Sequence, residues 1–216
     1  MRQLLYKEFK LAMHPTMYIF LLLSAMVLIP SYPYYVAFMY MCLAMFFTFL
    51  QGRETNDLFF TAMLPVRKKD VVTARIVMVC LFQLGMIFVS LPFAVLSVRI
   101  NPNGYNAAGI ELNTAFYGLV FLMFGGYNLC FLPGFYKTGR KLGKPLLLGV
   151  TFLILFMFAA ESAAQYIPSP VSAYLDVPGP AFSTQWPVLV LGILCWVGLT
   201  GLAERLSVRR FERLDL

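Results

Sequence analysis

The basic residues of this chain are confined to alternate connections between apolar segments. All but one of the 17 Lys and Arg residues lie before the first, between the second and third, between the fourth and fifth, or after the sixth of six such segments. The exception is Arg99. Because the cytoplasmic connections of membrane proteins are enriched in Lys and Arg, this alternation predicts a polytopic membrane protein with both termini in the cytoplasm.

The six apolar segments have the length of membrane-spanning helices. A helix needs roughly 17 to 25 apolar residues to cross about 30 Å of hydrocarbon. The predicted spans are 15–29, 33–50, 76–98, 112–136, 145–165 and 186–203. Their connections are too short to hold a soluble domain with its own core. We therefore expect an all-α fold in which residues 1–216 form a single transmembrane domain.

Membrane lipids best explain the positive charge. The chain has a formal net charge of +7 and a sequence pI near 9.3, values that also occur in nucleic-acid-binding proteins. Here the cations are spread over four segments beside the membrane instead of forming one basic patch. Anionic lipid headgroups are thus the expected counter-ions, and no nucleic-acid partner is expected.

The first apolar segment follows a basic stretch, as the apolar region of a cleaved signal peptide would. However, only Ser31 and Tyr32 separate Pro30 from Pro33, where the second segment begins. Such a short connection favours a retained helical hairpin over a cleaved leader.

Intramembrane catalysis has little support in the residue pattern. Such catalysis needs paired acids, a His with a carboxylate, or a nucleophile beside a base. The one histidine, His14, directly precedes Pro15, and Glu161 is the one carboxylate well inside a predicted span. We therefore expect the chain not to be an enzyme by itself.

Metal, disulfide and nucleotide sites are not indicated either. The four cysteines lie in separate predicted spans with no CxxC pair, which predicts neither a disulfide framework nor a zinc site. No GxxxxGK[ST] sequence, the pattern of a phosphate-binding P-loop, occurs. We therefore expect no cofactor in this chain, and any ATP and Mg²⁺ it depends on to be bound by another chain.

Polar residues at membrane depth are candidates for a functional pathway, because they are costly in hydrocarbon. The alternative is simple hydrogen bonding between helices. The candidates are Gln83, Asn128, Glu161 and Gln165. In addition, the glycine pair 125–126 and the Pro133–Gly134 step predict a weakened fourth helix.

The connection 52–75 holds the strongest local pattern. Thr55 or Asn56 is a suitable N-cap residue for a short helix, and Pro65 is a stop signal. The pattern predicts a short amphipathic helix on the cytoplasmic membrane surface. A second helix is expected to begin near Asp70 and to continue into the third span.

The N-terminal segment has a similar pattern. Leu4, Leu5 and Phe9 are interspersed with charged residues, which predicts a helix that lies parallel to the membrane. By pattern alone, interfacial anchoring without a protein partner explains both amphipathic helices equally well.

Together these features resemble the permease subunits of type-two ABC exporters, and more closely those of the phenol-soluble modulin exporter group. The resemblance rests on the six-span layout, the amphipathic N-terminal helix and the run 54–75 with its Leu64-Pro65-Val66-Arg67 step. It implies that the run contains a coupling helix that docks, with the N-terminal helix, on a separate P-loop ATPase. It also implies a second permease copy or a sister permease. The residues that it assigns to the coupling interface are Tyr6, Glu8, Glu54, Asp57, Leu58, Phe59, Phe60, Met63 and Leu64.

The composition favours an amphipathic or apolar cargo. The chain has 21 Phe, 12 Tyr and 12 Met and little fixed charge at membrane depth to match a sugar or a metal ion. Some aromatics, notably Tyr32, Tyr34 and Tyr35, are expected in the outer interfacial belt. With the resemblance, this favours export of amphipathic peptides, such as cytolytic or antimicrobial peptides, by alternating access. A lipid or hydrophobic drug exporter and a non-transporting membrane anchor or assembly subunit are the alternatives.

The topology is testable by accessibility labelling. A cysteine introduced at Met63 is expected to react with a membrane-impermeant maleimide only after the cells are permeabilised, because the basic connection around it lies in the cytoplasm. A cysteine at Tyr32, in the outer hairpin, is expected to react in intact cells. Labelling of position 63 from outside would contradict the predicted orientation.

Overall fold

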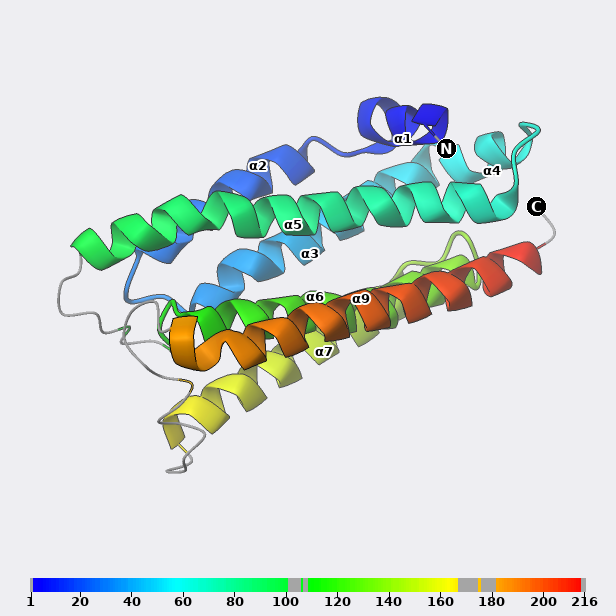
Figure 1. The fold of residues 1–216 in the computed structure, drawn as a ribbon. Helices are drawn as coiled ribbons and strands as arrows, with labels where there is room; N and C mark the ends of the chain where they lie inside the picture. The colour runs from blue at the N-terminus through cyan, green and yellow to red at the C-terminus, as the bar shows by residue number, and fades with distance from the viewer. Residues whose placement is uncertain (1, 101–105, 107–108, 167–174, 176–181, 215–216) are drawn as a thin grey trace.

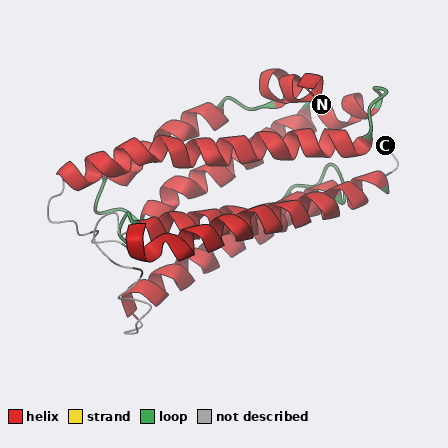
Figure 2. Ribbon diagram, in the orientation of Figure 1, coloured by secondary structure: helices red, strands yellow, loops and turns green. Residues whose placement is uncertain are grey.

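A computed structural model describes residues 2–100, 106, 109–166, 175 and 182–214 of the chain. Within these ranges the secondary structure is helical and contains no β-strand (Figure 2). The elements are α1 (Arg2–Lys7), η1 (Glu8–Ala12), α2 (Thr16–Leu22), η2 (Leu23–Leu28), α3 (Tyr34–Glu54), α4 (Asp57–Ala62), α5 (Lys68–Ile100), α6 (Thr114–Tyr136), α7 (Gly143–Glu161), η3 (Ser162–Tyr166) and α9 (Phe182–Glu212). The expected all-α class is confirmed.

Five of these helices are long and apolar enough to cross a membrane, and a bent pair brings the number to as many as six. The five are α3, α5, α6, α7 with η3, and α9. In the bent pair, α1 and η1 make an angle of 81° with α2 and η2. The predicted first span therefore corresponds to a short helix that follows a sharp break, and the N-terminal helix runs across its axis.

The long helices run roughly along one direction (Figure 1). The helix α6 packs mainly against α9 and α7, whereas α2 and η2 pack against α3 and α5. Contacts between α5 and α9 and between α3 and α6 join these two groups. The segments α1 and α4 and the last turns of α9 lie at the same end of the bundle, which we call the basic end.

Aromatic side chains fill much of the contact between the two groups. The ring of Phe49 on α3 lies edge-on to Phe131 and Phe135 on α6, at centroid distances of 5.3 and 4.8 Å. At the opposite end, Tyr34 and Tyr35 are buried, and Tyr35 contacts Phe116. These two tyrosines thus belong to the core, not to the interfacial belt in which they were expected, because their rings pack against α6.

Glycines allow α6 and α9 to approach closely. A Cβ atom added to Gly192 would lie 2.0 Å from the carbonyl oxygen of Gly118, and one added to Gly118 would lie 2.5 Å from that of Val188. Gly125 similarly faces the backbone of Trp196. The helix α6, predicted to be weakened there, is continuous through the glycine pair 125–126 and Pro133, and Gly125 allows close packing on α9.

The close contact of α6 and α9 predicts that alanine substitutions at two glycines of α9 differ in their effect on stability. Gly192→Ala is expected to lower stability by about 1–3 kcal/mol, the usual cost of overpacking. Gly198→Ala is the matched control, because nothing lies within 4 Å of the added Cβ, and it is expected to be neutral or slightly stabilising. The midpoint of thermal unfolding in detergent measures both. Equal midpoints would contradict the close crossing.

Candidate functional site

A buried arginine is the centre of an ionic contact at the basic end. The side chain of Arg75, on α5, is 1% exposed. Its Nε donates to Oε2 of Glu8 at 2.7 Å and its Nη2 donates to Oε1 at 3.2 Å. Nη2 also forms an ion pair with Asp57. One guanidinium therefore joins the N-terminal helix, α4 and α5.

A lysine completes this arrangement. The Nζ atom of Lys7 lies 2.8 Å from Oδ1 of Asp57 and 3.0 Å from Oε1 of Glu8. It also donates to the hydroxyl of Thr61 at 2.8 Å. We call Lys7, Glu8, Asp57 and Arg75 the ion cluster. It contains two cations and two carboxylates, so its formal charges cancel.

The local sequence explains why the cluster is buried. Glu8 lies on the same face of the N-terminal segment as Leu4 and Ala12, both buried, because residues four apart share a helix face. Gly52 on α3 leaves space for the guanidinium, since a Cβ there would lie 3.2 Å from Nη1 of Arg75. The ring of Phe49 lies 5.6 Å from the guanidinium carbon, within the range of a cation–π contact.

The electrostatics favour an ionised Asp57. Burial raises the pKa of this carboxyl group, but Arg75 and Lys7 outweigh that effect and hold the pKa below its ordinary value. A lowered pKa in the folded state contributes stability above the ordinary pKa, and this contribution is lost as the pH falls through the lowered value. The ion pairs of Asp57 therefore persist throughout the neutral range.

Exposed apolar residues lie on α4, directly after it, and at Tyr6 of α1. The exposed fraction is 61% for Tyr6, 41% for Phe59, 62% for Phe60, 66% for Met63 and 53% for Leu64. We call these five residues the apolar surface. The side chain of Glu54 beside them is also exposed and pairs with Arg53.

The structure thus divides the predicted coupling residues into two sets. Glu8, Asp57 and Leu58 face the interior, where Glu8 and Leu58 are buried and Asp57 is part of the ion cluster. The apolar surface and Glu54 face outward. The inward-facing residues hold α4 against the bundle. Only the outward-facing residues are available to a partner.

The start of α4 is fixed by a second connection. Asn56 occupies the N-cap position in the left-handed conformation with φ of 50°, and its side chain makes no capping bond. Its Oδ1 accepts instead from Nη2 of Arg140 at 3.0 Å. The segment between α6 and α7 thereby touches α4, and a cavity of about 250 Å³ lies between Phe59 and Gly139.

Further bonds link α5 to α9 and to the residues that follow α9. The hydroxyl of Thr73 donates to Oε1 of Glu204 at 2.6 Å. Nζ of Lys68 donates to the carbonyl oxygen of Leu214 at 2.7 Å. The helix that carries Arg75 is therefore tied to both groups of helices.

Two of the predicted polar residues at membrane depth contact each other. Nε2 of Gln83 donates to Oδ1 of Asn128 at 2.8 Å, and Nδ2 of Asn128 donates to Oε1 of Gln83 at 3.0 Å. Asn128 also donates to Thr200, and Trp196 donates to Gln83, both at 3.0 Å. These amides thus connect α5, α6 and α9.

Glu161 and Gln165 lie elsewhere, near the end of the bundle opposite the ion cluster. Oε2 of Glu161 accepts from the backbone N–H of Ile110 at 3.0 Å. Gln165 falls within η3, but its side chain lies outside the described part of the structure. The structure therefore does not join Glu161 to the pair formed by Gln83 and Asn128.

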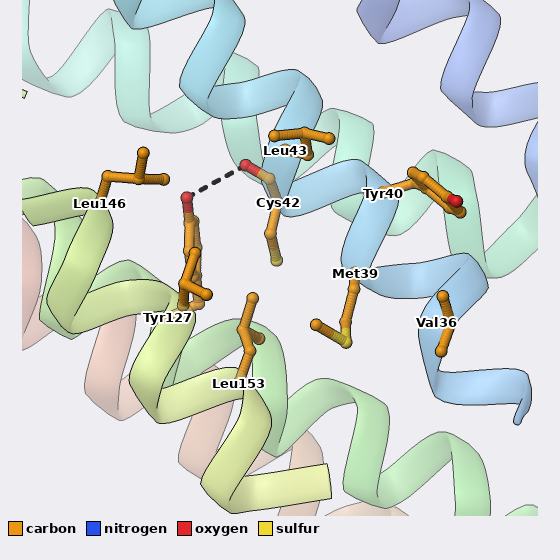
Figure 3. Close-up of a pocket in the computed structure, with 9 residues that line it drawn as sticks. Val36, Met39, Tyr40, Cys42, Leu43, Tyr127, Leu146 and Leu153 are labelled. Atoms are coloured by element: carbon orange, nitrogen blue, oxygen red, sulfur yellow. Dashed lines mark hydrogen bonds between the residues drawn. The ribbon is translucent and has the colours of Figure 1, made fainter. Parts of the chain in front are cut away.

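Apolar clefts open between the helices. One of about 240 Å³ is formed by α3, α6 and α7, with Met39, Cys42 and Leu153 in its wall (Figure 3). Tyr127 also lines this cleft, and its hydroxyl donates to the carbonyl oxygen of Cys42 at 3.1 Å. A larger cleft of about 540 Å³ lies between α5, α6 and α9.

Lys7 and Arg75 were not among the predicted site residues, although both belong to the ion cluster. A signal was present for Arg75, because it falls between Val71 and Val79 on a stripe of buried residues. A charged side chain at such a position needs a partner of opposite charge.

Removing Arg75 is expected to destabilise the protein strongly. Arg75→Met leaves Glu8 buried without its main cation, which costs about 3–5 kcal/mol. Arg53→Met is the control, because its pair with Glu54 is exposed and worth at most about 1 kcal/mol. The double variant Glu8→Met with Arg75→Met is expected to recover part of the loss. Thermal unfolding in detergent measures each variant, and equal midpoints for R75M and R53M would contradict this account.

The comparisons with known proteins agree with a membrane transport component. Residues 3–200 match the model of the family described as ABC-2 family transporter protein. Neither the curated proteins nor the solved structures that were compared contain a significant match. Permeases of the matched family are transmembrane components that generally work with an ATPase partner. Because the match covers most of the chain, this protein belongs to the ABC-2 family of transporter proteins.

Proposed function

We propose that this chain is the permease subunit of an ATP-driven exporter that moves amphipathic peptides out of the cell. A separate P-loop ATPase in the cytoplasm binds ATP and Mg²⁺ and docks on the apolar surface. Two permease copies, or this chain and a sister permease, form the transport pathway. The phenol-soluble modulin exporter group is the proposed closer relationship within the family.

The observation that carries the docking proposal is the apolar surface itself. Large exposed apolar patches mark interaction sites in proteins. Interfacial anchoring in the membrane would also use such residues, but it needs no firm support beneath them. Here α4 is only six residues long, yet its Asp57 forms an ion pair with Arg75 of α5. Arg75 in turn forms an ion pair with Glu8 of the N-terminal segment.

This support provides a path for motion. A displacement of α4 moves Asp57, and the ion pair with Arg75 passes the displacement to α5. The bonds of Thr73 and Lys68 extend it to the last turns of α9 and the residues that follow. Packed helices shift between discrete arrangements, so closure of two ATPase subunits would switch the bundle between inward-open and outward-open states.

The proposed cargo follows from the chemistry of the cleft between α3, α6 and α7. The walls of this cleft are mainly apolar, with a few polar groups such as the hydroxyl of Tyr127. A cargo with an apolar face suits such walls better than a sugar or a metal ion. A lipid or a hydrophobic drug is the second candidate for the same reason.

The docking proposal is testable with the co-expressed ATPase. Phe60→Asp is expected to abolish co-purification of a P-loop ATPase encoded beside this chain, because it places a charge on the apolar surface. Arg213→Asp is the control, since Arg213 is an exposed residue outside that surface. Unchanged co-purification and unchanged ATP hydrolysis in F60D would overturn the docking assignment.

The cargo is testable in proteoliposomes that contain the complex. ATP hydrolysis is expected to rise in the presence of amphipathic helical peptides and to stay at its basal rate with sugars. Stimulation by lipids or hydrophobic dyes alone would favour the second candidate. A chain that binds no ATPase and moves none of these molecules would favour a membrane anchor or assembly subunit.

A further inference from the structure

The larger apolar cleft runs along α5, and we call it the slot. It has a volume of about 540 Å³ and follows one face of α5 from Leu84 to Val95. Its opposite wall contains Tyr117 of α6 and Ile193 of α9. The slot lies in the half of α5 that is farther from Arg75.

The length of the slot matches half of a bilayer. Eleven residue steps separate Leu84 from Val95, and a helix rises 1.5 Å per residue, which gives roughly 16 Å. The hydrocarbon core is about 30 Å thick, so one leaflet supplies about 15 Å. Leu84 lies near the middle of the apolar part of α5. The slot therefore reaches from about the midplane to one surface of the hydrocarbon.

The chemistry of the slot suits a hydrocarbon chain. The hydroxyl of Tyr117 is already paired with Ser90, at 3.2 Å between the two oxygens, and Ser90 donates to the carbonyl oxygen of Ile87. The rim is open to the surroundings, because Phe88 is 66% and Val95 61% exposed. In a membrane these exposed apolar side chains contact lipid, so lipid chains reach the slot directly.

A cation stands at the outer end of the slot. Arg99 follows Val95 by one helical turn, on the same face of α5. It is exposed, and none of the ion pairs of the described residues includes it. It is also the one basic residue that the charge alternation leaves on the outer side. An exposed guanidinium at the hydrocarbon surface is a suitable partner for a phosphate group.

We propose that the slot binds one acyl chain of a phospholipid from the outer leaflet, and that Arg99 binds the phosphate of the same lipid. The slot supplies apolar contact along the chain from the interface to the midplane. Arg99 supplies charge-assisted hydrogen bonds at the head group. A second copy of this chain would cover an apolar slot equally well, but it would not account for a cation at the end of the slot. The proposal depends on the orientation in the membrane and not on the ATPase or the cargo.

The test uses the full chain in nanodiscs that contain phosphatidylglycerol with a photoreactive diazirine on its acyl chain. Mass spectrometry after illumination is expected to find the label on the segment from Leu84 to Val95. Ala94→Trp fills the slot and is expected to reduce this labelling to the level found on the lipid-exposed side of α7. Ala159→Trp, at an exposed position on α7, is the matched control and is expected to leave the labelling of α5 unchanged. Arg99→Gln is expected to weaken retention of the labelled lipid about tenfold, the effect of losing one charge-assisted hydrogen bond.

Two further measurements keep the test decisive. Leu189→Trp fills the slot from α9, and thermal unfolding identifies which of the two filling variants is folded. Labelling of α5 that stays at the parent level in a folded filling variant would overturn the proposal. Loss of label together with a changed assembly mass would also overturn it, because a second copy would then occupy the slot. Parent-level retention in R99Q would overturn the role of Arg99.

Discussion

The burial of Arg75 imposes the constraint on which the basic end depends. Removing an ion from water costs several kcal/mol even after the protein relaxes, so a guanidinium at 1% exposure is tolerated only with carboxylates in contact. Those carboxylates come from two other segments, Glu8 in the N-terminal helix and Asp57 in α4. A short helix that would have little stability alone thereby acquires a fixed position.

Because Asp57 is held by Arg75, residues that anchor α4 and residues that are exposed on it lie next to each other in the sequence. Asp57 and Leu58 face the bundle, whereas Phe60 is exposed. Successive residues of a helix point in directions about 100° apart, which makes such a division possible within two turns. A partner that contacted Phe60 would thus meet a helix whose first residue, Asp57, is held by ion pairs to Lys7 and Arg75.

The fold was largely predictable from the sequence, because apolar length and the distribution of Lys and Arg are properties of consecutive residues. The site was predictable only in part. The resemblance assigned Glu8 to the coupling interface, but the structure buries its side chain. Its partner Arg75 lies 67 positions away. Likewise, the bonds between Gln83 and Asn128 depend on how two helices are placed against each other, which no local pattern contains.

The glycine crossing has a consequence for how the bundle can deform. At Gly118 and Gly192 the backbones of α6 and α9 touch with no side chain between them. This contact therefore has no side chain that could change its rotamer to accommodate a rotation of one helix against the other. The seams that border α3, α5 and α7 contain open clefts instead. In any large rearrangement α6 and α9 would therefore move together as one rigid body, and the surrounding helices would move relative to this pair.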